Sequence, residues 1–303
     1  MSNSQVRHFL TLMDLSSAEL AQLLARAVEL KAAIAAAEKI TPLTRKTLAM
    51  IFNKSSTRTR VSFDTGMRQL GGGSIFLSPN DSQLGRGEPI QDSARVISRM
   101  VDGVMIRTDE HQQVELFAEY SAVPVINGLT DDFHPCQLLA DLLTFAELRG
   151  DIAGATVAWV GDGNNMCHSW MNAAQLCGFT LNIATPDGYQ PNARLLVERT
   201  ANVTLTTDPK AAVAGVDLIV TDTWASMGQE SEKTQRVTDF AGFCVDGTLM
   251  ALAKPDALFM HCLPAYRGLE VSASVIDGEQ SVVWQEAENR LHAQKALLEL
   301  LLV

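Results

Sequence analysis

Short apolar segments alternate along this chain with longer segments in which apolar residues recur at helical spacing. In the first half, the short segments predict strands at residues 47–52, 74–77, 103–106 and 123–127. The longer segments predict amphipathic helices at residues 16–36, 58–70, 90–100 and 112–120. A strand followed by a helix, repeated many times, is typical of parallel sheets that are covered by helices on both faces.

The second half of the chain repeats this alternation. Its predicted strands lie at residues 156–160, 181–184, 203–206, 217–221 and 257–260, and its predicted helices at 166–176 and 285–302. A further long helix, 135–149, joins the two series. Pro135 suits the first turn of that helix, and Gly150 suits the position just after its end.

Two such series predict an α/β fold with two doubly wound domains, each built on a parallel sheet, joined by long helices. We expect the first domain to cover residues 1–133 and to be completed by the C-terminal helix 285–303. Residues 134–150 then form an interdomain helix, and residues 151–284 form the second domain. Because ligands of such folds bind at the carboxyl ends of the strands, we expect a site in the crevice between the domains.

Composition and charge narrow the classes of partner. The chain has 303 residues, of which 47% are hydrophobic, and a net charge of −11. An acidic surface repels nucleic acid and acidic lipid, whereas a small anionic substrate needs only local positive charge. We see no apolar core of signal-peptide length at the N-terminus and no apolar run of membrane-helix length. The five cysteines form no C-x-x-C pair, which indicates free thiols in the cytosol.

Residues 55–60 read Ser-Ser-Thr-Arg-Thr-Arg and lie between a predicted strand and a predicted helix. Hydroxyl groups, two guanidinium groups and the unpaired N–H groups of a helix N-terminus can all be directed at one anion there. The alternative is an ordinary N-cap followed by exposed arginines. Because the whole hexapeptide is present, we favour a phosphate site.

A second polar motif, His134-Pro135-Cys136-Gln137, begins the interdomain helix. Within one helical turn, His134 and Gln137 can face the same ligand. The imidazole could donate a hydrogen bond to a carbonyl oxygen on which negative charge develops. A capping histidine beside a buried glutamine explains the motif equally well.

A glycine-containing turn follows the strand 156–160 and reads Gly-Asp-Gly-Asn-Asn-Met from position 161. It begins like a dinucleotide-binding fingerprint, but Met166 stands at the third glycine position. The pattern therefore argues against a nicotinamide-dependent dehydrogenase. What remains is a strand-to-helix turn that can offer Asn165 and backbone N–H groups to a small polar ligand.

Two further motifs follow strands of the second domain. Asp222 comes directly after the strand 217–221, where a carboxylate is well placed for an ammonium group, and Ser226-Met227-Gly228 follows in the same loop. The alternative is a surface loop anchored by Trp224. Cys262, in His261-Cys262-Leu263-Pro264, ends the strand 257–260, although a cysteine there is more often core packing. No zinc-type His/Cys spacing is present, and we expect no catalytic metal.

Taken together, Ser56 to Arg60, His134 to Gln137 and His261 to Pro264 resemble the aspartate/ornithine carbamoyltransferases. The resemblance covers essentially the whole chain, with the motifs in the family's order. Asp222, the Ser-Met-Gly turn and Cys262 resemble the branch of the family whose acceptor is ornithine. The resemblance implies transfer of a carbamoyl group from carbamoyl phosphate to the δ-amine of ornithine, without a cofactor.

The resemblance also implies roles for individual residues. The phosphate would be held by Ser56, Thr57, Arg58, Thr59 and Arg107. The carbonyl oxygen would be faced by Thr59, Arg107 and His134, and the carbamoyl amide by Gln137, Arg290 and the backbone of Cys262 and Leu263. The amino-acid end of ornithine would be bound by Asn165, Asp222, Ser226 and Met227.

Oligomeric state and proton transfer are the remaining expectations. Gln83 resembles a family residue that reaches into a neighbouring subunit's site, which implies a trimer or a multiple of trimers. Arg107, Thr59 and His134 would polarise the carbonyl group. Cys262 and Asp222 are expected nearest the reacting amine, and the sequence leaves open which of them, if either, takes its proton. Rival interpretations are another acceptor, such as putrescine, an acylated ornithine or aspartate, and a catalytically inactive binding protein.

Overall fold

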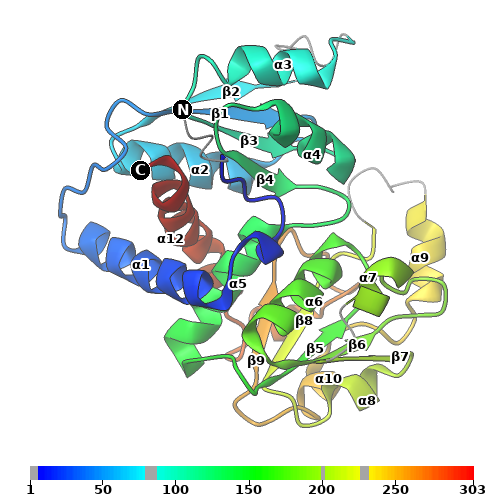
Figure 1. Ribbon diagram of the computed structural model, residues 1–303. Helices are drawn as coiled ribbons and strands as arrows, with labels where there is room; N and C mark the ends of the chain where they lie inside the picture. The colour runs from blue at the N-terminus through cyan, green and yellow to red at the C-terminus, as the bar shows by residue number, and fades with distance from the viewer. Residues whose placement is uncertain (1–5, 79–86, 199–201, 226–231) are drawn as a thin grey trace. The chain divides into compact units, whose positions relative to one another are not determined.

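The computed structural model describes residues 6–78, 87–198, 202–225 and 232–303. The chain divides into two compact units, one made of Met1–Leu143 with Glu288–Val303 and the other of Thr144–Ala287. The boundaries fall inside two helices, α5 (Pro135–Arg149) and α12 (Val283–Leu302). Figure 1 labels most of the helices and strands that are named below.

The first unit contains a parallel sheet of four strands in the order β2-β1-β3-β4. Its strands are β1 (Thr47–Phe52), β2 (Gly73–Leu77), β3 (Gly103–Arg107) and β4 (Val125–Leu129). The chain first adds β2 on one side of β1 and then β3 on the other side. The strand order therefore reverses between β1 and β3, which is where open α/β sheets bind ligands.

Ser16 and Ser56 cap the N-termini of two helices of the first unit with their side chains. The helices of this unit are α1 (Ser17–Ala35), α2 (Thr57–Gln69), α3 (Ile90–Ile97) and α4 (His111–Tyr120), with the short 3-10 helix η1 (Leu12–Asp14) before them. Ser16 caps α1 in the predicted capping box with Glu19. Apolar residues of β1, β3, α3 and α4, including Ile51, Val104 and Phe117, form one buried cluster. This packing fixes the strand ends at which site residues lie.

The second unit contains a parallel sheet of five strands in the order β7-β6-β5-β8-β9. Its strands are β5 (Thr156–Val160), β6 (Thr180–Ala184), β7 (Val203–Thr206), β8 (Leu218–Thr221) and β9 (Leu258–His261). Here the strand order reverses between β5 and β8. The loops that follow these two strands begin at Gly161 and at Asp222.

Several helices of the second unit are short. They are α7 (Ala193–Glu198), α8 (Pro209–Val213), α9 (Lys233–Asp239), α10 (Gly247–Met250) and α11 (Ala273–Ile276), beside the longer α6 (Asn165–Cys177). The sequence pattern did not predict these short helices. The main apolar cluster joins β5 and β8 to Trp224, Phe240 and Phe243. Trp224 stacks on Phe240 with ring centroids 5.3 Å apart, so the loop after β8 is anchored in the core.

The predicted fold class is confirmed, because both sheets are parallel and are interleaved with helices. Four element bounds were wrong by more than one residue. The third helix ends at Ile97 rather than at residue 100, β4 covers Val125–Leu129 rather than residues 123–127, and α12 begins at Val283 rather than at residue 285. Pro124 lies between the predicted and the observed start of β4 and has no N–H to donate to a sheet.

Two further predictions concern the chain as a whole. The five cysteines are all free thiols, as the sequence predicted. In the part of the chain that the structure describes, we find no helix with the length and apolar character needed to cross a membrane. The predicted domain boundaries, 1–133, 134–150 and 151–284, remain predictions.

Candidate functional site

The first group of candidate residues lies at the reversal point of the first sheet. Ser56 is the N-cap of α2, and its hydroxyl accepts a hydrogen bond from the Thr59 N–H at 3.3 Å. Arg107 is the last residue of β3, directly beside the end of β1, where Phe52 is its partner in the sheet. The motif at residues 55–60 and Arg107 therefore come from neighbouring strand ends, as an anion site requires.

The Thr59 hydroxyl joins two arginines that are far apart in sequence. It accepts hydrogen bonds from Arg290 Nη2 at 2.7 Å and from Arg107 Nη1 at 3.4 Å. Arg290 Nη1 also donates to the Gln137 side chain at 2.8 Å. All four side chains are buried. Two buried guanidinium groups that converge on one hydroxyl create a strongly positive position.

His134 lies within the electrostatic field of these cations. Burial lowers the pKa of His134 well below its usual value, and the charges of Arg290, Arg107 and Arg58 lower it further. The imidazole is therefore neutral at physiological pH, so it can donate a hydrogen bond without adding charge. The Gln137 amide donates to Asp141 at 2.8 Å, which fixes the orientation of the side chain that meets Arg290.

Lys54 ties together three loops at the carboxyl ends of the first sheet. Its ammonium group forms ion pairs with Asp109, after β3, and with Asp131, after β4. The Asn53 N–H also donates to the Arg107 carbonyl at 2.8 Å. The loop that leads into residues 55–60 is thus fixed on both sides.

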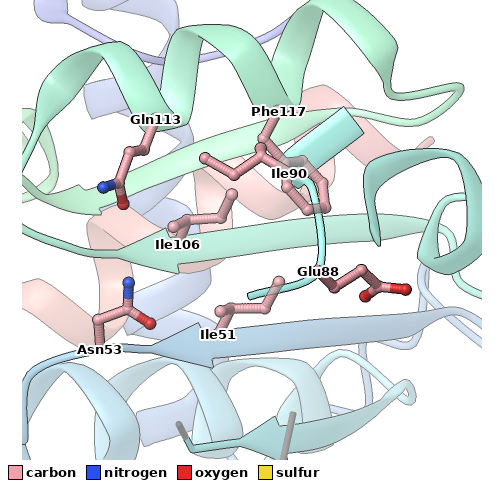
Figure 2. A pocket seen from close by; sticks show the side chains of 7 residues that line it. All are labelled: Ile51, Asn53, Glu88, Ile90, Ile106, Gln113 and Phe117. Atoms are coloured by element: carbon pink, nitrogen blue, oxygen red, sulfur yellow. The ribbon is translucent and has the colours of Figure 1, made fainter. Parts of the chain in front are cut away.

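A separate cavity of about 180 Å³ lies near the same strand ends. Figure 2 shows its lining side chains, which come from β1 and the loop after it, β3, α4, and the start of α3 with the loop before it. They are Ile51, Asn53, Glu88, Ile90, Ile106, Gln113 and Phe117. None of them is a predicted site residue, and this cavity is not the candidate anion site.

The second group of candidate residues lies at the reversal point of the second sheet. The buried carboxylate of Asp222 follows β8 and accepts three hydrogen bonds. Oδ1 accepts from the Thr223 N–H at 2.7 Å and from Cys262 Sγ at 3.2 Å, and Oδ2 accepts from the Asn164 amide at 2.9 Å. The structure thus brings Asp222 and Cys262 together from loops after two neighbouring strands.

A buried histidine holds the turn after β9. His261 Nδ1 accepts a hydrogen bond from the Leu263 N–H at 2.9 Å, so the ring proton lies on Nε2 and is donated to Glu270 at 3.2 Å. Leu263 has a φ of +59°, a region that non-glycine residues rarely adopt. The His261–Glu270 pair therefore keeps the backbone of residues 262–263 in a conformation it would not adopt alone.

Asp222, His261 and Cys262 form a cluster of potential metal ligands in the described part of the chain. However, both ring nitrogens of His261 are engaged, one by Leu263 and the other by Glu270. Binding a metal through this ring would require one of those hydrogen bonds to break. The arrangement therefore favours the role of His261 as a support of the turn, and the absence of a metal stays a prediction.

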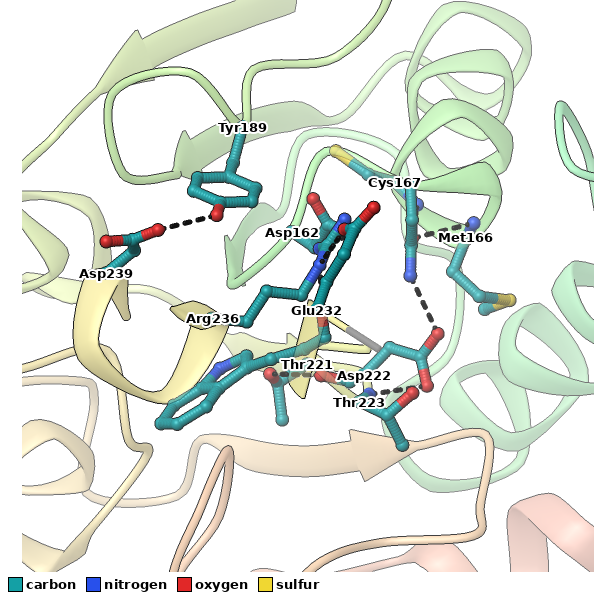
Figure 3. Close-up of polar contacts among 12 residues, drawn as sticks. Asp162, Met166, Cys167, Tyr189, Thr221, Asp222, Thr223, Glu232, Arg236 and Asp239 are labelled. Carbon is teal, nitrogen blue, oxygen red and sulfur yellow. Dashed lines mark hydrogen bonds and ion pairs between the residues drawn. The ribbon is translucent and has the colours of Figure 1, made fainter. Parts of the chain in front are cut away.

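A buried arginine connects the loops of the second unit. Arg236, on α9, donates through Nη1 to Asp162 at 2.9 Å and to the Trp224 carbonyl at 2.7 Å. Figure 3 shows Arg236 directed at Asp162, with Asp222 on the neighbouring loop. Burial raises the pKa of Asp162 to about 6, although the adjacent guanidinium acts in the opposite direction. One side chain thus anchors the loops after both β5 and β8.

The predicted site residues fall into three sets. Thr59, Arg107, Gln137 and Arg290 are in direct contact with one another, Ser56 is bonded to the Thr59 backbone, and Arg58 and His134 lie within their electrostatic influence. In the other unit, Asp222 meets Cys262, Leu263 is bonded to His261, and Asn165 is the first residue of α6. Gln83, Ser226 and Met227 lie outside the described residues, and Thr57 is the exposed first residue of α2.

Sequence reasoning missed Asn164, Arg236 and the His261–Glu270 pair. A signal was present only for Asn164, because an asparagine two residues before Met166 at a strand-to-helix turn is a typical N-cap. Arg236 contacts Asp162, which is distant in sequence, and Glu270 contacts His261 inside the core. Local sequence does not indicate these contacts, because they form only when the chain has folded.

Known proteins resemble this chain over nearly all of its length. A family model described as "Aspartate/ornithine carbamoyltransferase, carbamoyl-P binding domain" matches residues 7–147. A second model, "Aspartate/ornithine carbamoyltransferase, Asp/Orn binding domain", matches residues 153–301. The ornithine carbamoyltransferase of Methylococcus capsulatus is 65% identical over 296 residues, which are 98% of this chain and 98% of that protein.

Solved structures agree with these matches. The crystal structure of ornithine carbamoyltransferase from Burkholderia thailandensis has a TM-score of 0.92 and 53% sequence identity, and the match covers 98% of this chain and 99% of that one. The enzyme of the same name from Pyrococcus furiosus has a TM-score of 0.94 and 48% identity, with 100% of this chain and 98% of that one covered.

Proposed function

Since the chain belongs to the aspartate/ornithine carbamoyltransferase family, we propose that it transfers the carbamoyl group of carbamoyl phosphate to the δ-amine of L-ornithine. The products are L-citrulline and phosphate. The observation that carries this proposal is the buried cluster in which Arg107 and Arg290 share the Thr59 hydroxyl. Such a cluster provides the positive charge and the oriented donors that a small acyl phosphate needs.

Carbamoyl phosphate would be bound by the first group of residues. Ser56, Thr57, Arg58 and Thr59 surround the N-terminus of α2, where N–H groups and the helix dipole favour the phosphate. Arg107, Thr59 and the neutral imidazole of His134 would donate to the carbonyl oxygen. Gln137, Arg290 and the backbone of Cys262 and Leu263 would hold the carbamoyl amide.

Ornithine would be bound by the second group. Asp222 carries the negative charge that an ammonium group requires, and Asn165 lies at the start of α6 on the neighbouring loop. Ser226 and Met227 complete the proposed acceptor site. The related proteins named as ornithine carbamoyltransferases support ornithine over other acceptors.

The reaction forms a bond between the δ-nitrogen and the carbamoyl carbon and breaks the bond from that carbon to the phosphate oxygen. Negative charge develops first on the carbonyl oxygen, where Arg107, Thr59 and His134 are proposed to stabilise it. It then passes to the leaving phosphate beside Arg58. The attacking amine must be neutral, although an alkyl ammonium has a pKa of about 10.4 in water. Cys262 and Asp222 are the side chains proposed to lie nearest this amine.

No cofactor takes part in this scheme, because neither oxidation nor electron storage is required. We further propose that the protein acts in the cytosol as a trimer or a multiple of trimers. In that assembly, Gln83 would reach the phosphate site of a neighbouring subunit. The free thiols support a reducing compartment.

Citrulline formation tests the proposal directly. The purified chain is incubated with carbamoyl phosphate and one of four acceptors, namely ornithine, putrescine, an N-acylated ornithine or aspartate. We expect citrulline from ornithine and at least about a hundredfold lower kcat/KM with the other three, which is about 2.7 kcal/mol of discrimination. Turnover of another acceptor at the ornithine rate would refute the assigned specificity. Absence of any product would refute the transferase function.

A further inference from the structure

Asn164 stands between two loops of the candidate acceptor site and uses both ends of its side chain. Its Oδ1 accepts hydrogen bonds from the N–H groups of Met166 at 3.0 Å and Cys167 at 3.2 Å, which makes it the N-cap of α6. Its Nδ2 donates to Asp222 Oδ2 at 2.9 Å. The cap thus determines which end of the amide faces Asp222, because only the oxygen can accept from the helix.

The hydrogen bonds of Asp222 use three of the acceptor positions of its carboxylate. A carboxylate offers about four lone-pair positions. Among the described residues, Oδ1 accepts from Thr223 and Cys262, whereas Oδ2 accepts only from Asn164. Oδ2 therefore keeps one acceptor position, and the Asn164 amide determines the direction in which it points. Figure 3 shows the Asp222 carboxylate beside Thr223, with Met166 and Cys167 on the neighbouring helix.

We propose that Asn164 is a positioning residue of the acceptor site. It fixes the Asp222 carboxylate in the orientation that receives the α-ammonium group of ornithine. This inference rests on the proposed function, since it assigns Asp222 to the acceptor. Asn164 itself does not touch the reacting atoms. Its effect passes through Asp222, and helix capping is what gives its amide a single orientation.

Two substitutions separate positioning from capping. In Asn164→Ser the hydroxyl caps the helix about as well as asparagine does. It stands where Cγ stood, however, about 1.3 Å short of the lost Nδ2, and no longer reaches Asp222. In Asn164→Ala both the cap and the donor are lost. Lys254→Met is the control, because it removes an ion pair with Asp217 at the opposite end of β8.

Steady-state kinetics and thermal unfolding are measured on the full-length protein. We expect Asn164→Ser and Asn164→Ala to raise the KM for ornithine about fivefold or more, while the KM for carbamoyl phosphate stays within twofold. The melting temperature should fall in Asn164→Ala and remain near the wild-type value in Asn164→Ser. Lys254→Met should leave both KM values unchanged.

An ornithine KM within twofold of wild type in Asn164→Ser would overturn the inference and leave capping as the only role of Asn164. Should that variant fail to fold, Asn164→Asp replaces it, since aspartate caps equally well but repels Asp222. An unchanged ornithine KM in Asn164→Asp would overturn the inference in the same way. If wild-type protein makes no citrulline, the proposed function itself is wrong, and that outcome is distinct from an active wild type whose variants are unaffected.

Discussion

Replacing Asp222 with asparagine tests the charge of the acceptor site with almost no change in shape. The carboxylate accepts from Thr223 and Cys262 on one oxygen and from Asn164 on the other. An asparagine has only one acceptor oxygen. If that oxygen stays with Thr223 and Cys262, the new NH₂ group faces the NH₂ group of Asn164, and that hydrogen bond is lost.

The expected magnitude follows from these contacts. A hydrogen bond to a charged group contributes about 1.5–3 kcal/mol. Losing it to the ornithine ammonium should therefore raise the KM for ornithine about 10- to 150-fold. The unpaired donor on Asn164 should in addition lower the free energy of unfolding by about 1–3 kcal/mol. The KM for carbamoyl phosphate should be unchanged, because the proposed phosphate contacts lie in the other unit.

The matched control is Asp217→Asn, at the other end of the same strand. Asp217 precedes β8 and accepts from the Thr156 N–H at 2.9 Å and from Lys254 Nζ at 2.6 Å. This variant should lose stability but keep the wild-type KM for ornithine. Initial rates over an ornithine series and urea unfolding are measured for both variants. Equal ornithine KM values in Asp222→Asn and wild type would refute the assignment of Asp222.

Four further predictions address the other parts of the site. Arg107→Ala should raise the KM for carbamoyl phosphate at least about tenfold, since a charge-assisted contact is lost, and an unchanged value in initial-rate measurements would remove Arg107 from the anion site. Cys262→Ala should slow turnover without weakening the binding of carbamoyl phosphate. Full turnover with an unshifted pH profile would show that the thiol contributes only to packing. Burial, with Lys295 and Lys31 nearby, lowers the pKa of His292 from 6.5 to about 4. Only the unfolded state then takes up this proton as the pH falls from about 6.5 to about 4, so the free energy of unfolding should drop in that window. Urea unfolding at several pH values should show a smaller drop in the free energy of unfolding for His292→Gln than for wild type. An equal dependence on pH in the two proteins would contradict the lowered pKa of His292. Refolding inactive Gln83→Ala and Arg58→Ala chains together should restore activity if sites are shared across subunits, and a mixture that stays inactive while wild type recovers would exclude sharing.

The central strands of the two sheets could be predicted because they are buried on both faces. Such strands appear as apolar runs, and β1 and β5 were predicted to the residue. β7 was also predicted to the residue, although it is an edge strand without a buried residue. Helices as short as α10 and α11, four residues each, contain barely one turn and show no period to recognise. Their caps, Asp246 and Ser272, would have been visible, but a cap without a following apolar stripe predicts a turn equally well.

Site residues were predictable where one strand end carries a whole motif. Ser56 to Thr59 belong to that class, because the residues after a buried parallel strand must emerge at the ligand-binding edge. Arg107 also ends a strand, but only the family resemblance pointed to it. Arg290 is different, since its hydrogen bonds to Thr59 and Gln137 join segments 231 and 153 residues away. Nothing in the local pattern around Arg290 indicates those partners, and only the family resemblance pointed to it.

The two reversal points differ in the sign of the charge they present, and this explains how a chain with a net charge of −11 can present a positively charged candidate site. At the first, Arg107 and Arg290 converge on a hydroxyl, and burial keeps His134 neutral, so the local field is positive. At the second, the Asp222 carboxylate accepts from three neutral donors among the described residues, so the local field is negative. Local placement outweighs net charge because the Debye length is about 8 Å at physiological salt, so surface carboxylates farther away are largely screened. Raising the salt concentration should therefore weaken the attraction of an anion to the buried Arg107 and Arg290 much less than it weakens the attraction within exposed ion pairs of the surface.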